Sequence, residues 1–219
     1  MPDASLPLDV ASDAANRAAE DAPASRKRPK PGERREQILH TLAAMLEEPG
    51  GERITTSALA ARLSVSEAAL YRHFASKAQM FEGLIEFIEH SVFSLINQIT
   101  EREAAASDSA GGSDGARQAA KIATMLLQFA EKNPGMARVM VGDALVFENE
   151  RLQQRMNLFF DKVESALKQA LRASPGQDAP VAAAVVAAFV AGRLHRYVRS
   201  GFKRLPTEHL DASLARILG

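Results

Sequence analysis

Apolar residues recur every three or four positions along most of the chain, which is the spacing of an amphipathic helix. Between Glu33 and Leu46, for example, Ile38, Leu42 and Leu46 fall on one helical face. The same spacing predicts further helices, which we place at residues 57–63, 67–74, 76–103, 116–132, 136–141, 144–172, 179–200 and 207–218. No segment alternates apolar and polar residues as a half-buried strand does, so we predict an all-α fold without a sheet.

Proline, glycine and small polar residues separate these helices. We expect Pro49-Gly50-Gly51 to end the first helix, and we expect residues 105–115 to form a loop. The apolar run from Val181 to Gly192 is 12 residues long. Because a membrane-spanning helix needs about 20 apolar residues, we interpret this run as a buried helix and predict no membrane span.

The N-terminal part of the chain has an uneven distribution of charge. Residues 1–25 are rich in Ala, Asp, Ser and Pro, sum to −4 and carry no apolar stripe, so we predict disorder and no signal peptide there. A basic arm with prolines follows at residues 26–31. Residues 26–80 hold ten Lys or Arg against six Asp or Glu, although the whole chain is neutral. This positive region fits a surface that binds phosphates, but a solvated charged face would have the same composition.

Several kinds of chemistry are excluded by what the sequence lacks. The chain has no cysteine, so it has no disulfide, no thiolate metal site and no cysteine nucleophile, which agrees with a cytoplasmic protein. We find no glycine-rich phosphate loop, no nucleophile elbow and no metal-ligand spacing, and the five histidines are scattered over separate predicted helices. We therefore predict a protein that is not an enzyme and that uses no cofactor or metal ion.

The most informative segment, residues 54–81, predicts two short helices joined by a tight turn. Its apolar positions would meet in a small shared core, formed by Leu59, Ala60, Leu63, Val65, Leu70 and Phe74. The alanines at positions 60 and 61 allow the two helices to cross closely. This is the pattern of a helix-turn-helix, in which the first helix braces the second and the second enters the major groove of DNA.

The outward positions of the second helix are candidates for contact with DNA: Ser66, Glu67, Ala68, Ala69, Tyr71, Arg72 and His73. Glu67 could accept a hydrogen bond from the N4 amino group of cytosine, and an alanine methyl could touch a thymine methyl. Both assignments have alternatives. An acid at the start of a helix also stabilises the helix dipole, and Tyr71 could be a half-buried core residue.

Phosphate contacts are expected on both sides of this helix. Tyr71, His73 and Lys77 can bind the DNA backbone from one side, and Thr55 and Thr56 can bind it from the start of the first helix. A structural capping role is the alternative for His73. Four basic residues could follow the adjacent backbone or minor groove, namely Arg28, Lys30, Arg34 and Arg35.

The segment resembles the DNA-binding domain of the TetR family. The family pattern has a Thr-led helix, a Val-Ser turn and the run Leu-Tyr-x-His-Phe-x-x-Lys, and this chain matches it with Thr55, Val65-Ser66, Leu70 to Phe74 and Lys77. One departure is Ser64, where the family usually has glycine. If the turn requires a positive φ, Ser64 carries a small strain.

The resemblance implies a TetR-like all-α fold, with an N-terminal helix-turn-helix domain and a C-terminal helical dimerisation domain. We divide the chain into a disordered tail at residues 1–32, a DNA-binding domain at 33–77, and a dimerising and partner-binding domain at 78–219. The helix at 179–200 is rich in small residues and is expected to pack, with the helix at 207–218, against a second copy of the chain. An ordinary core helix would show the same pattern.

A longer resemblance covers most of residues 33–210. The segments TTSALAARLSVSEAALYRHFASKAQMFEGLIEFIE, KNPGMARVMVGDALVFENERLQQRMNLFF and RYVRSGFKRLPT are similar to nucleoid occlusion factors, a group within the TetR family. This resemblance implies a nucleoid-associated homodimer that binds palindromic double-stranded DNA sites. It also implies that the DNA-bound protein antagonises polymerisation of the division protein FtsZ. The number of dimers per site is left open.

The same resemblance implies that the FtsZ tail docks in a groove between the helices at 76–103 and 116–132. The residues implied are Phe87, Met125, Gln128, Lys132 and Asn133. Phe87 and Met125 could instead be ordinary core side chains. The alternative function is a ligand-responsive TetR-family transcriptional repressor, whose C-terminal domain would need an enclosed pocket with a few polar groups.

Overall fold

The structure is a computed structural model that describes residues 32–110, 115–174, 176 and 178–219. The predicted disordered tail and the basic arm, with Arg28 and Lys30, lie outside these residues. Residues 34–219 form one compact unit. All regular elements in the described part are helices, which confirms the predicted all-α class.

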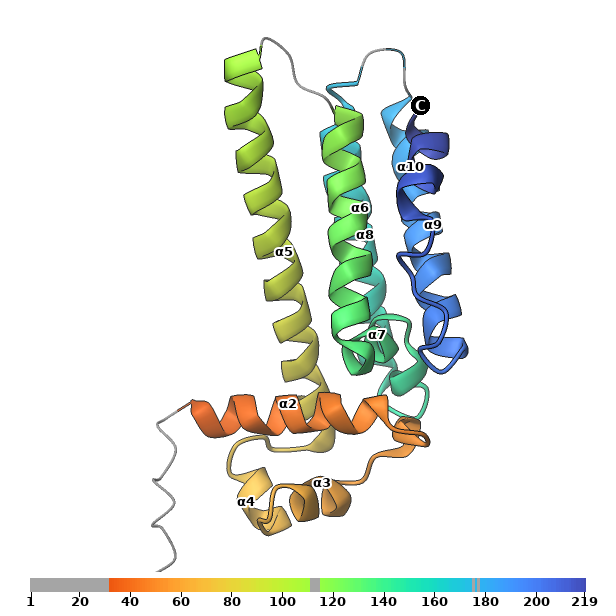
Figure 1. Cartoon of the computed structure of the whole chain (residues 1–219). Coiled ribbons are helices and arrows are strands. Elements are labelled where there is room, and N and C mark those ends of the chain that lie inside the picture. The colour runs from red at the N-terminus through yellow and green to blue at the C-terminus, as the bar shows by residue number, and fades with distance from the viewer. Residues whose placement is uncertain (1–31, 111–114, 175, 177) are drawn as a thin grey trace, which may run out of the picture. The chain divides into compact units, whose positions relative to one another are not determined.

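The helices are numbered as in Figure 1. In chain order they are α2 (Glu33–Glu47), η1 (Gly51–Arg53), α3 (Thr56–Arg62), α4 (Glu67–Tyr71), α5 (Lys77–Ala110), α6 (Gly115–Lys132), α7 (Pro134–Met140), η2 (Asp143–Leu145), α8 (Glu150–Leu171), α9 (Ala179–Arg199) and α10 (Leu210–Leu218). We call α2–α4 the head and α5–α10 the body.

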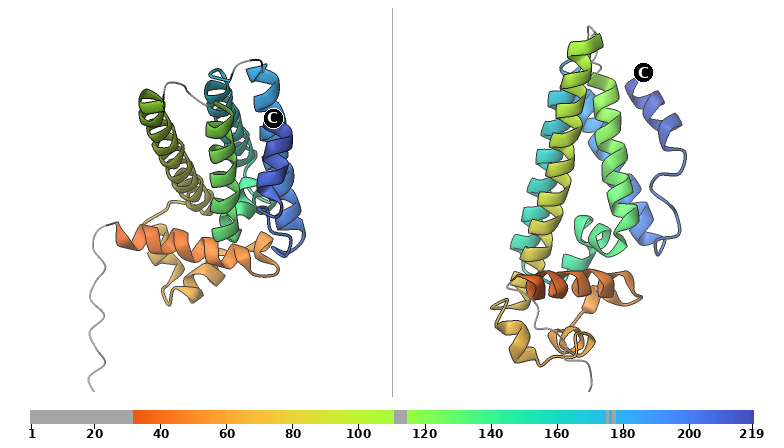
Figure 2. Two further views of the ribbon diagram at one scale, coloured as in Figure 1. Left: turned by 45° about the horizontal axis from the view of Figure 1, so that its top comes forward. Right: turned by 60° about the vertical axis from the view of Figure 1, so that its left-hand side comes forward.

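The head lies across one end of the body, and the chain passes from the head into the body at the start of α5. Figure 1 shows α2 lying crosswise beneath the long helices, with α3 and α4 on its far side, and Figure 2 shows the same arrangement from two other directions. In the body, α8 packs most extensively on α9, while α6 contacts α5, α8, α9 and α10. The buried apolar residues form one continuous cluster from Ile38 in α2 to Leu218 in α10. The head is therefore held on the body through a shared core.

Three predicted helix boundaries are wrong. The end of α4 is at Tyr71 rather than Phe74, because the chain turns there to bury the Phe74 ring. At α8 the helix starts at Glu150 rather than Ala144, since Gly142 has φ 80° and the Asn149 side chain caps the helix by accepting from the Arg151 N–H at 3.0 Å. The last helix starts at Leu210 rather than 207 because His209 has φ 52°.

The predicted loop at 105–115 is also wrong over its first half, because α5 continues to Ala110. Alanine-rich sequence has a high helix propensity, and the buried carboxylate of Glu103 anchors this part of α5 to α6. Glu103 accepts a hydrogen bond from Arg117 Nε at 2.9 Å and another from Lys121 Nζ. The bond from Lys121 lowers the pKa of Glu103, burial opposes this, and Arg117 adds to the lowering.

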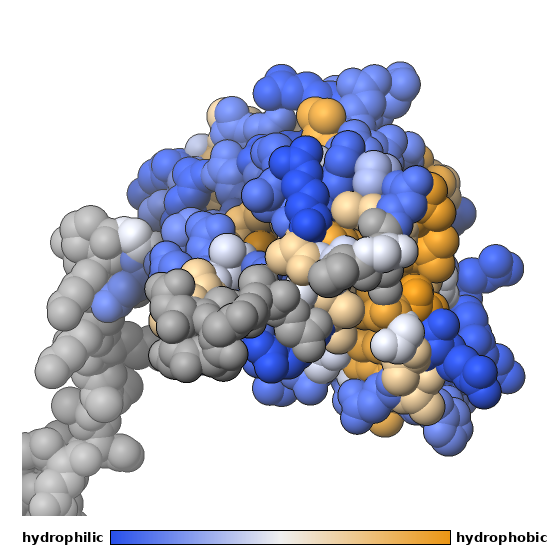
Figure 3. Space-filling view, turned by 90° about the horizontal axis from the view of Figure 1, so that it is seen from above, coloured by the Kyte–Doolittle hydropathy of each residue, from blue (hydrophilic) through white to orange (hydrophobic). Residues whose placement is uncertain are grey.

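Helix α9 contains the apolar run that we predicted to be buried, and this prediction holds for only one face. Ala183, Val186 and Val190 are buried, but Val181 and Val185 are 59% and 48% exposed. Seen from above in Figure 3, apolar residues gather on the right-hand side of the molecule, the side on which α9 lies in Figure 1. By length and composition alone α9 could cross a membrane, but a single such helix is weak evidence, because a core helix passes the same test.

Candidate nucleic-acid interface

Two capped helices form the helix-turn-helix in the head. Thr55 Oγ1 accepts from the Ala58 N–H at 3.2 Å at the start of α3, and Ser66 Oγ accepts from the Ala69 N–H at 3.3 Å at the start of α4. A five-residue helix is not stable alone. Leu70 and Phe74, each 1% exposed, hold α4 against the rest of the head. The predicted shared core is thus confirmed, with Leu63 and Val65 half-buried against it.

The turn between α3 and α4 depends on a left-handed residue. Ser64 has φ 54°, and the N–H of the next residue, Val65, donates to the Ala60 carbonyl at 3.0 Å. The predicted strain at Ser64 is therefore present, because an L-residue with a side chain pays roughly 1 kcal/mol or more for this backbone conformation. The turn keeps α4 at a fixed angle to α3.

The outer face of α4 is accessible over most of the predicted contact residues. The exposed ones are Ser66, Glu67, Ala68, Tyr71, Arg72 and His73, whereas Ala69 is half-buried. Tyr71 is 45% exposed, which disfavours the alternative that it is a core residue. Small residues on this face keep the helix backbone near the surface, which suits a helix that enters a groove.

A hydrogen-bonded chain joins α3 to α4 and was not expected from the sequence. The Thr56 hydroxyl donates to Glu67 Oε2 at 2.7 Å, and the Tyr71 hydroxyl donates to Thr56 Oγ1 at 3.5 Å. Thr56 was predicted to bind a phosphate, but here its proton points to a carboxylate. Its position makes it a residue that orients Glu67.

Lys77, the predicted phosphate ligand at the start of α5, is paired with an acid of the body. Its ammonium contacts the carboxylate of Glu148, whose side chain is only 8% exposed. Arg151 and Arg155 make further ion pairs from α8 to Glu82, Glu86 and Glu89 of α5. Sequence reasoning missed Glu148, because nothing local signals a partner 71 residues away.

The two arginines predicted upstream lie at the start of α2. Arg34 donates to the Gln37 side chain at 2.6 Å, and the guanidinium of Arg35 lies 4.3 Å from the centre of the Phe74 ring. Arg35 thus packs over the same ring that fixes α4. Both side chains retain N–H groups that could reach a phosphate.

The residues predicted to bind a partner do not all meet in one place. Met125 and Gln128 line a hollow of about 620 Å³ between α6, α10 and Ile99 of α5. Phe87 is 37% exposed and packs edge-on against His40 of α2, with ring centres 5.6 Å apart.

The other two predicted residues are at the head-facing end of α6. Lys132 is exposed, and the Asn133 side chain donates to the Phe129 carbonyl at 2.7 Å. The structure therefore brings together two of the five partner residues and leaves the other three on neighbouring surfaces.

Similarity to known proteins extends over most of the chain. Residues 38–84 match the family model described as bacterial regulatory proteins of the tetR family, and residues 116–217 match the SlmA-like model of the tetracyclin repressor-like C-terminal domain. Nucleoid occlusion factor SlmA of Idiomarina loihiensis is 48% identical to this chain over 186 residues, which cover 82% of this chain and 90% of that protein. The chain belongs to the SlmA family of nucleoid occlusion factors.

A second SlmA, from Shewanella amazonensis, is 50% identical over 185 residues, covering 81% of this chain and 89% of that protein. Among solved structures, the fatty acid degradation regulator FadR from Bacillus halodurans has a TM-score of 0.67 at 16% identity, covering 89% of this chain and 97% of that chain. At that identity the likeness concerns the fold alone. It agrees with the predicted TetR-like architecture.

In this SlmA-family chain, the TetR-type match contains the whole helix-turn-helix and the first turns of α5. The SlmA-like match contains α6 to α10 almost completely. The exposed face of α9 and the hollow beside Met125 both belong to the SlmA-like part.

Proposed function

We propose that this SlmA-family protein binds specific palindromic chromosomal sites as a homodimer and, when bound to DNA, antagonises FtsZ polymerisation. It would thereby prevent septum formation over the nucleoid, as a cytoplasmic protein associated with the chromosome. The observation that carries this proposal is the match to proteins named nucleoid occlusion factor at 48–50% identity, over a region that includes α4 and its exposed face.

The exposed face of α9 supports the homodimer. Val181, Val185, Ala188 and Gly192 follow each other at helical spacing and are all exposed, and the neighbouring helix α8 exposes Leu158 to 58%. A continuous exposed apolar stripe of this kind is normally covered by a partner. A dimer would also place two copies of α4 on the two halves of a palindrome.

The function is tested by sedimenting FtsZ polymers in the presence of this protein and the DNA site it selects. We expect less polymer in the pellet with DNA and protein together than with protein alone. Lys132→Glu should restore the polymer while DNA binding stays intact, and Arg216→Glu, an exposed arginine on α10, should behave like the wild type. Polymer mass that does not change under any condition would instead favour a ligand-responsive repressor.

Lys77→Ala should weaken DNA binding about tenfold or more, irrespective of sequence, because one charged phosphate contact is lost. The plot of log affinity against log salt should become shallower by about 0.9. Fluorescence anisotropy of labelled duplex at several salt concentrations measures both quantities. Glu148→Gln removes the carboxylate that competes with DNA for Lys77, so its affinity for DNA should equal or exceed that of the wild type. If the salt slope of Lys77→Ala equalled that of the wild type, Lys77 would not contact a phosphate.

Glu67→Gln should change which base pair is preferred at one position of each half-site. A carboxylate accepts from cytosine N4, whereas a glutamine amide pairs with N6 and N7 of adenine. Thr56→Val removes the donor that orients Glu67, so it should weaken the base preference at the same position of the half-site without changing which base is preferred. Selection of bound duplexes from a random library measures these preferences, and identical selected sites for wild type and Glu67→Gln would argue against a base contact.

A further inference from the structure

The C-terminal half of α9 and the segment after it form the most one-sided charge distribution in the described structure. From Ala179 to Thr207 the sequence contains five Lys or Arg and no Asp or Glu: Arg193, Arg196, Arg199, Lys203 and Arg204. Five other cations of the body are each paired with a carboxylate, namely Arg117, Lys121, Arg138, Arg151 and Arg155. Within the residues described here, Arg196 and Arg204 have no carboxylate at ion-pair distance.

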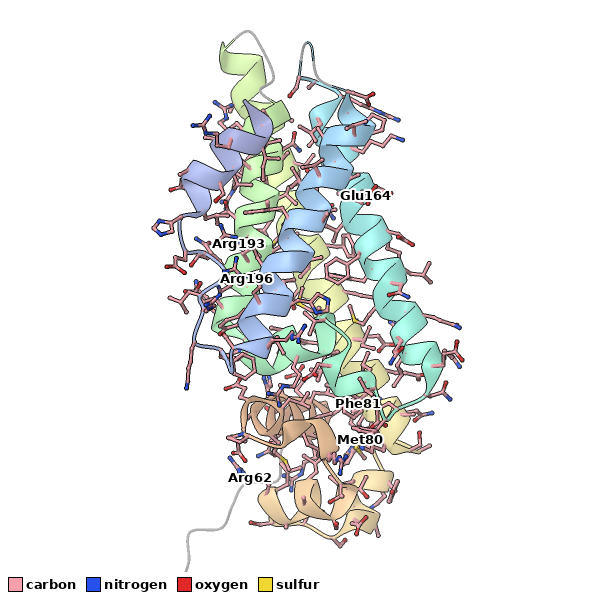
Figure 4. All side chains as sticks on the ribbon, turned by 90° about the vertical axis from the view of Figure 1, so that its right-hand side faces the viewer. Arg62, Met80, Phe81, Glu164, Arg193 and Arg196 are labelled. Carbon is pink, nitrogen blue, oxygen red and sulfur yellow. The ribbon has the colours of Figure 1, made fainter. Side chains whose placement is uncertain are left out.

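Three of these five cations line a small hollow. It has a volume of about 260 Å³ and is formed by Arg193, Arg196, Arg204, Leu205, Glu208 and His209. Figure 4 shows Arg193 and Arg196 on the side of α9 that faces the connection to α10. The single carboxylate at the hollow, on Glu208, lies 3.8 Å from the His209 ring rather than at ion-pair distance from a guanidinium.

The wall of the hollow is rigidly built. The guanidinium of Arg193 donates to the Pro206 carbonyl at 3.3 Å, to the Glu208 carbonyl, and to Ser213 Oγ at 2.9 Å. These bonds hold the loop and the first turn of α10 in place, and none of the groups that accept them is a carboxylate. The Thr207 hydroxyl, which donates to Glu131 on α6, fixes the loop from the other side.

Backbone strain is concentrated at the same place. Three described residues other than glycine have a positive φ, and two of them, Phe202 and His209, are in this connection. Such conformations persist where the surrounding structure requires them, and they are common at ligand-binding loops. At the rim of the hollow α10 begins without a side-chain cap, so its first-turn N–H groups add positive potential, which the carboxylate of Asp211 in the same turn partly offsets.

We propose that this hollow binds a compact phosphate-bearing anion of the size of a diphosphate. Guanidinium groups match phosphate oxygens in pairs and keep their charge at all relevant pH values. The volume equals that of about nine water molecules in the liquid, which is too small for a drug-sized ligand. A concave site also suits a small anion better than the convex ridge of a DNA backbone.

The test is isothermal titration calorimetry of the full chain with sodium pyrophosphate, against sodium chloride of equal ionic strength. We expect saturable binding of one pyrophosphate per chain. Arg204→Gln and Arg196→Gln should each weaken it about tenfold or more. Arg216→Gln, which removes an exposed charge outside the hollow, should leave it within about twofold. Equal melting temperatures of all variants would show that the fold is kept.

A second arm separates the free anion from the phosphates of DNA. Binding to a mixed-sequence 30-bp duplex is measured for wild type and Arg204→Gln, with and without saturating pyrophosphate. We expect unchanged duplex affinity in each case. Weaker duplex binding by Arg204→Gln, or competition by pyrophosphate beyond its ionic-strength effect, would overturn the proposal in favour of DNA. Absence of pyrophosphate binding, or equal losses in Arg204→Gln and Arg216→Gln, would overturn it outright.

Discussion

Val185→Glu is expected to convert the dimer into monomers and to weaken binding to a palindromic site at least about 100-fold. Val185 lies in the middle of the exposed apolar face of α9 and is 48% exposed in the single chain. A glutamate there has good helix propensity and open solvent around it in a monomer. In a dimer it would bury a charge without a partner, which costs several kcal/mol. A monomer has a single copy of α4 and contacts only one half-site, so its affinity for the palindromic site is lower than that of the dimer.

Sedimentation velocity measures the oligomeric state, and anisotropy with the selected duplex measures the affinity. Ala104→Glu is the matched control, because it adds the same charge at an exposed alanine of α5, outside the two helices predicted to form the dimer contact. It should remain dimeric and bind DNA normally. If Val185→Glu remained dimeric at micromolar concentration, the exposed face of α9 would not be the dimer contact.

The parts of the fold that were predicted well are those encoded by local sequence. The turn at Ser64 and the core positions Leu70 and Phe74 all depend on residues within one or two helical turns. Apolar periodicity located α2, α6 and α9 to within one residue at nearly every end. Local pattern suffices here because each signal acts on its immediate neighbours.

The parts that were missed depend on contacts between distant segments. The pairing of Lys77 with Glu148 and the anchoring of α5 by Glu103 both involve partners on distant segments of the chain, and no spacing rule identifies such partners. The apolar run in α9 shows a related limit, because composition reveals that a helix is apolar but not how much of it the same chain covers. The five predicted partner residues were separated for the same reason, since periodicity does not set how α5, α6 and α10 are placed against each other.

Gly135→Ala is expected to lower the stability of the protein by about 3 kcal/mol or more, because it overpacks a contact between two backbones. A Cβ at position 135 would lie 1.9 Å from the carbonyl oxygen of Ala43 in α2. Neither atom belongs to a flexible side chain, so α7 and α2 would have to move apart. The melting temperature should fall by about 6–12 °C, measured by circular dichroism or calorimetry.

Gly83→Ala is the comparison that separates this clash from a general effect of replacing glycine. A Cβ at position 83 would meet side-chain atoms of Phe74 and Leu39, the nearest at 3.1 Å, and these side chains can shift. The alanine also gains up to about 1 kcal/mol of helix propensity inside α5. Gly83→Ala should therefore change stability much less. Because α2 is the helix through which the head contacts α7, Gly135→Ala should also weaken DNA binding. If the Gly135→Ala protein were as stable as the Gly83→Ala protein, α2 and α7 would not approach each other this closely.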